Sequence, residues 1–214
     1  MNMKYFNAET YLKIICEIRD RIHTAESLSE VENMVFIEST SLQIRKILEL
    51  VAYLSILVNG DKLNNKERSE YHAKKIVECL NEKTTIFYPF PSCVIEKSDG
   101  KEKNIFPLYL ESSLSQVEFK EAYQLCGKVL HAQHPLKTKV NFQDIKRKNH
   151  NYLQRLKSLM TQHTIPVKRP NGVYTFLYVK VDFSERSNPK YPFIREFSAD
   201  ISSEEQLVEI FSWG

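Results

Sequence analysis

Residues 44–58 of this chain read Ile44-Arg45-Lys46-Ile47-Leu48-Glu49-Leu50-Val51-Ala52-Tyr53-Leu54-Ser55-Ile56-Leu57-Val58. From Ile47 onward only Glu49 and Ser55 stand outside the hydrophobic residues. A helix that is apolar on every side is buried, so this segment predicts the central helix of the fold. A buried carboxylate is costly unless it is paired. Arg45 precedes Glu49 by about one helical turn, which lets the two side chains meet.

The Arg45–Glu49 pair has two interpretations. In the first, it is a buried charged group that orients a catalytic or ligand-binding side chain on another helix. In the second, it is a structural ion pair that fixes how the helices pack. Both remain open, because structural networks perturb charged groups as active sites do.

Helical periodicity and capping residues predict further helices around this segment. Ser29 and Glu32 form a capping-box pattern, which predicts a long helix from about Val31 to Val58. Asn59-Gly60 predicts a left-handed cap at its end. Other helices are expected at residues 8–24, 67–81, 142–163 and 204–211, and a second capping box, Ser115 with Glu118, predicts one that ends near His131.

Two segments have the pattern of β-structure. In residues 86–110, Pro89 and Pro91 forbid a continuous helix, and Asp99-Gly100 predicts a hairpin turn. Residues 173–182 alternate after an Asn171-Gly172 turn, and residues 191–197 predict a third strand. We therefore expect a mainly α fold. It consists of a helical bundle over residues 1–163 with a short β insertion at about 86–110, and a C-terminal β hairpin or meander over 164–214 with a short terminal helix.

Positive charge is concentrated between Lys137 and Arg169. This stretch carries nine basic residues and one acid, Asp144, for a charge of +8. The whole chain has a net charge of +3, so the remainder is −5. Such asymmetry predicts an anionic partner. The predicted nucleic-acid contacts are Lys146, Arg147, Lys148 and Arg155, and the alternative is a solvated helix face.

His131 is the second candidate for chemistry. Gly127 lies one turn before it, and a glycine inside a helix often marks a close backbone approach. Such an approach could bring Glu49 to the His131 imidazole, an arrangement suited to acid–base catalysis. The alternative is a histidine that caps a helix C-terminus. The predicted catalytic residues are Arg45, Glu49, Tyr123 and His131.

The composition limits which cellular compartment and which cofactors we expect for this protein. Cys16, Cys79, Cys93 and Cys126 form no Cys-x-x-Cys pair, so we expect reduced thiols in the cytoplasm and no metal site. The chain has only five glycines and no nucleotide-loop motif, and no cofactor is expected. Its longest apolar run falls short of the roughly 20 residues of a membrane span, and no signal peptide is expected.

Three blocks resemble an uncharacterised family of bacterial cytosolic proteins. They are residues 41–50, 87–91 and 123–132, and the resemblance covers roughly residues 35 to 135. More distantly, a helix with Arg45-x-x-x-Glu49, followed by a helix that ends in His131, is similar to HEPN-like helical bundles. That superfamily includes metal-independent ribonucleases, toxins and antiviral proteins, often dimeric. Its usual signature separates an Arg from a His by four to six residues, whereas two residues separate Arg147 from His150 here.

Two functions follow as hypotheses. The resemblance implies a HEPN-like protein that binds or cleaves RNA, in a toxin or phage-defence setting and as a possible homodimer. In it His131 would be the acid–base group, and Arg45 and Glu49 its orienting pair. The alternative is a non-enzymatic protein-interaction subunit of a larger complex. In this alternative, the exposed edge of the C-terminal strands pairs with a partner protein.

Overall fold

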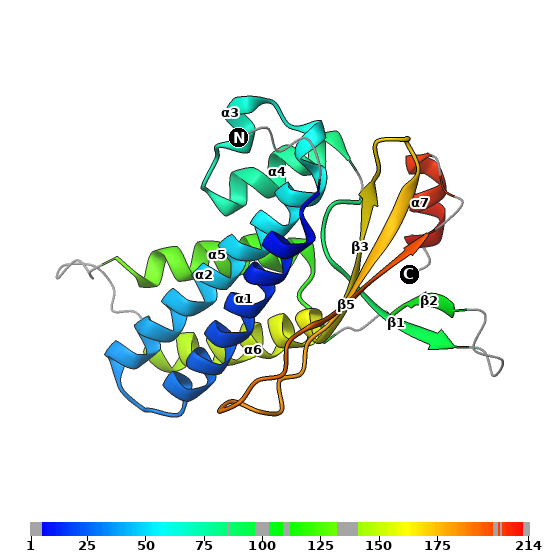
Figure 1. Ribbon diagram of the computed structural model, residues 1–214. Coiled ribbons are helices and arrows are strands. Elements are labelled where there is room, and N and C mark those ends of the chain that lie inside the picture. The colour runs from blue at the N-terminus through cyan, green and yellow to red at the C-terminus, as the bar shows by residue number, and fades with distance from the viewer. Residues whose placement is uncertain are drawn as a thin grey trace.

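The described part of the chain folds into helices packed against a β-sheet (Figure 1). The computed structural model describes residues 6–84, 86–96, 103–108, 112–131, 141–198, 201 and 203–211. The helices are α1 (Ala8–Ser29), α2 (Met34–Asn59), α3 (Asn65–Arg68), α4 (Ala73–Lys83), α5 (Gln116–Val129), α6 (Phe142–Thr161) and α7 (Glu204–Phe211), with a 3-10 turn η1 (Gly60–Lys62). The strands are β1 (Phe90–Glu96), β2 (Lys103–Pro107), β3 (Gln162–Lys168), β4 (Tyr174–Lys180) and β5 (Phe193–Ser198).

The predicted mainly α fold, a helical bundle with separate β additions, is wrong. The protein is a mixed α/β structure whose strands form one antiparallel sheet, curled like half a barrel, in the order β2-β1-β3-β4-β5. The β insertion and the C-terminal strands join because β1 pairs with β3, with Phe90 opposite Thr164 and Pro91 opposite His163. Local periodicity carries no information about a pairing between segments so far apart in sequence, which is why the prediction missed it.

Both faces of β4 are covered. Leu177 and Val179 point into the main hydrophobic core, which the helical bundle shares. Tyr174 and Phe176 point the other way, into a second cluster that includes Leu207 of α7. Figure 1 shows α7 on the side of the sheet away from the bundle. Alternate side chains of residues 173–182 therefore pack into two different apolar clusters, one on each face of the sheet. The alternation does not separate a buried face from a solvent-exposed one.

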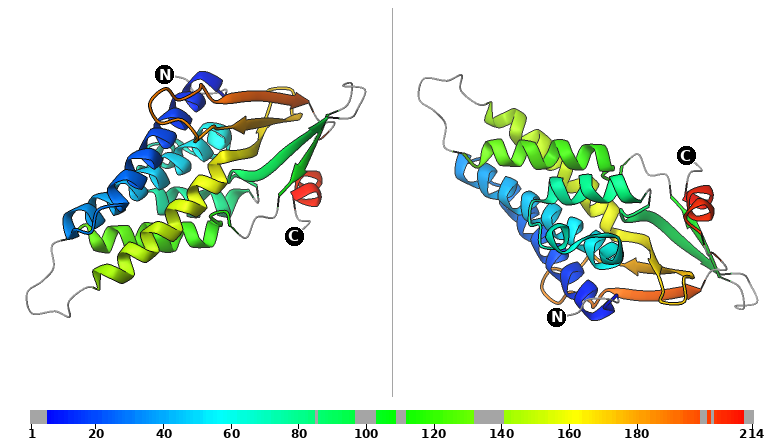
Figure 2. Two further views of the ribbon diagram at one scale, coloured as in Figure 1. Left: turned by 90° about the horizontal axis from the view of Figure 1, so that it is seen from below. Right: turned by 90° about the horizontal axis from the view of Figure 1, so that it is seen from above.

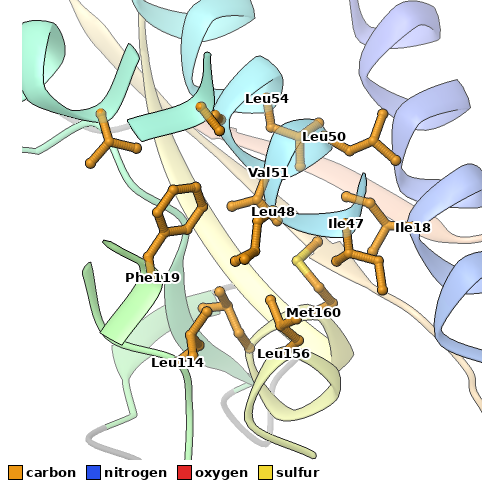
Figure 3. Close-up of a cluster of buried hydrophobic side chains, with 14 of the residues drawn as sticks. Ile18, Ile47, Leu48, Leu50, Val51, Leu54, Leu114, Phe119, Leu156 and Met160 are labelled. Atoms are coloured by element: carbon orange, nitrogen blue, oxygen red, sulfur yellow. The ribbon is translucent and has the colours of Figure 1, made fainter. Parts of the chain in front are cut away.

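The prediction that residues 44–58 lie in the central helix is confirmed. α2 contacts α1, α4, α5, α6 and β3. Its inward side chains, among them Leu48 and Val51, lie between Phe119 of α5 and Met160 of α6 (Figure 3). The helix is not apolar on every side, however, because Glu49 and the adjacent Lys46 face a partly open surface. Among the described residues, no helix is both long and apolar enough to cross a membrane.

Several helix boundaries differ from the predictions. α1 continues to Ser29, whose hydroxyl donates to the Glu26 carbonyl, so the Ser29–Glu32 capping box does not form. α2 is capped instead by Asn33, whose side chain accepts the Val35 amide. Gly60 has a φ of −62° and begins η1, so the predicted left-handed cap is wrong.

The predicted helix over residues 67–81 is also interrupted. α3 ends at Arg68, and the Glu70 carboxylate accepts the amides of Tyr71 and His72 before α4 begins. By contrast, the capping box of Ser115 with Glu118 is confirmed at the start of α5. The hairpin turn at Asn171-Gly172 is confirmed too, with Gly172 at a φ of +84°. The turn predicted at Asp99-Gly100 lies outside the described residues.

Candidate functional site: a charged helix junction and a basic pocket

Three of the four predicted catalytic residues meet where α2 packs on α5. The Arg45 Nε lies 3.3 Å from Glu49 Oε1, and a second Arg45 nitrogen donates to the Tyr123 hydroxyl at 2.9 Å. The same guanidinium lies 4.4 Å from the centroid of the Tyr123 ring. Lys46 Nζ lies 2.9 Å from the other Glu49 oxygen. Glu49 is therefore a carboxylate held by two cations, and its side chain is only 14% exposed.

Gly127 accommodates Arg45 and not the imidazole of His131. A Cβ placed on Gly127 would lie 2.9 Å from a terminal nitrogen of Arg45. The absence of a side chain at this position thus lets the guanidinium lie between the two helices. Burial raises the pKa of the Tyr123 phenol, an effect that the charge of Arg45 opposes. Arg45 therefore meets a neutral phenol that can accept its hydrogen bond.

His131 lies apart from this junction. Tyr123 and Gly127 meet Arg45, whereas Val129 packs with Ile37, so α5 runs antiparallel to α2. Ile37 precedes Glu49 by twelve residues, about 18 Å of helix. His131 is exposed just beyond Val129, at the far end from Glu49. The junction therefore has the contacts of a structural ion pair, and the catalytic role of the four residues stays a prediction.

The junction should stabilise the fold through coupling between Arg45 and Tyr123. In a double-mutant cycle with Arg45→Met and Tyr123→Leu, we expect a coupling energy of about 1 kcal/mol, because the pair combines a hydrogen bond with a cation–π contact. Urea unfolding of the four proteins measures it. Lys46→Met, at a more exposed cation, should cost less than about 0.5 kcal/mol. A coupling energy near zero would show that α2 and α5 are held together without this contact.

The predicted nucleic-acid contacts separate into two groups. Lys146, Arg147 and Lys148 lie in the first turns of α6, with side chains that are 26%, 79% and 47% exposed. Arg155 lies further along the helix and donates to the Ser113 carbonyl at 3.0 Å and to Glu118 at 2.8 Å. That half-buried ion pair ties α6 to the start of α5. Arg155 is thus engaged in the fold, and the three earlier residues remain at the surface.

Lys146 and Arg147 line a surface pocket of about 280 Å³. Its other lining residues are Ser29 at the end of α1, and Gln143 and His150 of α6. No acidic residue lines it among the described residues. Asn141 caps α6 by accepting the amides of Gln143 and Asp144, so the pocket offers its side chains and not these amides. The lining contributes two cations, each of which pairs with an acid outside the lining, Glu32 or Asp144. The hollow is suited to an anion that replaces these acids.

A buried asparagine positions this face of α6. The Asn149 side chain is 1% exposed and donates to the Ile37 carbonyl at 3.1 Å and to the Ser41 hydroxyl at 2.8 Å. Ile145, Val129 and Ile37 pack together beside it. His131, two residues after Val129, therefore lies at the same end of the bundle as the pocket, where Figure 2 shows α5 ending and α6 beginning side by side.

Sequence reasoning did not single out Ser29, Gln143 or His150 as members of one site. Gln143, Lys146, Arg147 and His150 have the spacing i, i+3, i+4, i+7, which places them on one face of a helix. That spacing was a readable signal, and it also separates Lys148 and Arg155 from the face. No pattern in the sequence could have added Ser29, because it comes from another helix.

No family model, curated protein or solved structure matches the chain. Within the described ranges, no group of three or more His, Cys, Asp or Glu residues could hold a metal ion. Cys16, Cys79, Cys93 and Cys126 are free, and burial raises the pKa of the Cys126 thiol to about 12. The basic pocket is therefore the candidate site that local geometry favours.

Proposed function

We propose that this protein binds RNA through the basic pocket between α6 and the end of α1. The observation that carries the proposal is the convergence of Lys146, Arg147 and His150 on one hollow that no described acidic residue lines. Two of the four residues predicted as phosphate contacts lie in it. The proposal places the protein in the cytoplasm, in a toxin or phage-defence setting.

RNA cleavage without a metal ion is the second part of the proposal. His131 lies at the same end of the bundle as the pocket, and His150 lines the pocket itself. Either imidazole can exchange protons with a ribose hydroxyl, and such acid–base work needs no metal. Arg45 and Glu49 would act indirectly, by holding α5 in place against α2.

Binding is tested with a fluorescent single-stranded RNA and a charge-reversed protein. We expect Lys146→Glu/Arg147→Glu to weaken binding roughly tenfold or more, because it reverses both cations of the pocket. Lys74→Glu/Lys75→Glu is the matched control. It changes the net charge equally at exposed lysines of α4, and should change affinity far less.

Equal losses in both double variants would mean that RNA responds only to overall charge. Affinity that is independent of salt would also contradict phosphate contacts. If no RNA binds, the interaction-subunit function remains, with β5 as a described edge strand and Phe193 exposed on it.

Cleavage is tested by incubating the same RNA with the protein in the presence of a chelator. Loss of activity in His131→Ala, in His150→Ala or in both would identify the acid–base group. Undiminished cleavage in His131→Ala would end the role predicted for that residue.

A further inference from the structure

We infer that the ligand of the basic pocket is a phosphate monoester, as at a phosphorylated RNA end, and not the interior of an RNA strand. This inference rests on the proposed function and specifies its substrate class. It follows from three features of the described residues: the number of cations in the pocket, the pairing of other cations on the bundle, and the exposure of the acids that pair with the pocket cations.

The charge of the pocket matches a monoester. A monoester carries about −1.5 to −2 charges at pH 7 and three terminal oxygens, whereas each phosphate inside a strand carries one negative charge. Lys146 and Arg147 supply two positive charges, and the Gln143 amide and the His150 ring add further hydrogen-bonding groups. A dianion with three oxygens uses this set more fully than a diester does.

Three described cations further from the pocket, which would be needed for a strand-binding track, are paired with acids on other elements. Arg155 pairs with Glu118, and Lys157 lies 2.6 Å from Glu26, whose side chain is 12% exposed. Arg186 also pairs with Glu26, at 3.1 Å. In each pair the carboxylate is at most 25% exposed, and the pairs tie α6 and the β4–β5 connection to α1 and α5. A strand leaving the pocket along α6 would therefore meet neutralised charges.

The acids that pair with the two pocket cations are more exposed than Glu118 and Glu26. Lys146, itself 26% exposed, lies 2.9 Å from Glu32, whose side chain is 73% exposed. The 79% exposed Arg147 pairs with Asp144 one turn away, and Asp144, 32% exposed, also pairs with Lys148 at 2.7 Å. Exposed ion pairs contribute little to stability and exchange readily with other charges. A phosphate can therefore displace Glu32 and Asp144, which makes these two acids internal competitors of the ligand.

The test compares one short RNA with a 5′-phosphate, a 3′-phosphate or hydroxyls at both ends, together with a nucleoside 5′-monophosphate and its nucleoside. We expect one phosphorylated end to bind about tenfold or more tightly than the hydroxyl form, through charge-assisted hydrogen bonds. This advantage should disappear in Lys146→Gln/Arg147→Gln. The salt slope should be about −1 to −2, whereas contact with six phosphates of a strand would give about −4.

A gain of affinity provides the second measurement. Glu32→Gln and Asp144→Asn each remove a competing carboxylate, and each should tighten binding of the phosphorylated end roughly two- to fivefold. Both sites are at the surface, and the melting temperature of each variant checks that its fold is retained. Weaker binding in these variants would contradict the displacement of Glu32 and Asp144.

The outcomes separate this inference from the proposed function. Equal affinity for hydroxyl and phosphorylated RNA, with loss in the charge-reversed variant, would overturn the monoester and keep RNA binding. Binding of the nucleoside monophosphate but of no RNA would keep the monoester and overturn RNA binding. If neither binds, both are wrong.

Discussion

Replacing Phe119 with alanine is expected to lower the free energy of unfolding by about 3–5 kcal/mol. Phe119 is fully buried against the side chains of the central helix (Figure 3). Its ring also meets the Tyr88 ring edge-on, with the two centroids 6.1 Å apart. Truncation removes the transfer free energy of the ring and leaves a cavity that the surrounding helices can only partly fill. Because α5 also carries Tyr123 and Gly127, the loss should loosen the junction with Arg45.

Val117→Ala is the matched control in the same helix. Val117 is 69% exposed, so its truncation should change stability by less than about 0.5 kcal/mol. Chemical denaturation followed by circular dichroism measures both variants. Similar free energies for the two would mean that α5 does not pack on the core as described.

Lowering the pH from 7 to 4 is expected to cost about 3 kcal/mol of stability through His163 alone. His163 is completely buried, and its Nε2 is hydrogen-bonded to the Tyr11 hydroxyl at 3.1 Å. Burial lowers the pKa of His163 from 6.5 to about 4. The unfolded chain therefore takes up the proton first as the pH falls. The contribution is complete above pH 6.5 and is lost by about pH 4.

The measurement is the difference in unfolding free energy between the wild type and His163→Gln at several pH values. This difference should shrink as the pH falls, since carboxylates elsewhere titrate equally in both proteins. Tyr11→Phe is the control, because it removes the hydrogen bond but leaves His163 buried, and it should keep the pH dependence. A difference that stays constant between pH 7 and 4 would contradict a buried, neutral His163.

The contacts around Arg45 show what local spacing can and cannot predict. The meeting of Arg45 with Glu49 follows from their spacing in one helix, and the structure confirms it. The contacts of Arg45 with Tyr123 and Gly127 join two helices. The only hint of them in the sequence was a glycine, Gly127, inside a predicted helix. The approach of Glu49 to His131 was expected from the same glycine, but α5 runs antiparallel to α2 and places His131 at the other end. The relative direction of two packed helices is a property of the tertiary structure, and residue spacing within each helix does not predict it.

The basic stretch shows the same division. Its charge and its helix were predictable from residues 137–169, and so was the face shared by Lys146, Arg147 and His150. The sequence did not show which of these cations can contact a ligand. Arg155 and Lys157 pair instead with Glu118 and Glu26 on other helices. A charge count over the sequence cannot show which cations pair with poorly exposed acids and which line a pocket.

The sequence by itself determined the central helix, the Arg45–Glu49 pair, the capped start of α5 and the hairpin turn at Asn171-Gly172, because each depends on residues within about one helical turn or one β-turn. The tertiary structure alone decided that β1 joins β3 in one sheet, that Ser29 lines the basic pocket, and that His131 lies far from Glu49. These arrangements depend on contacts between distant segments, which form because together they bury the apolar surfaces of α2, α5, α6 and the sheet.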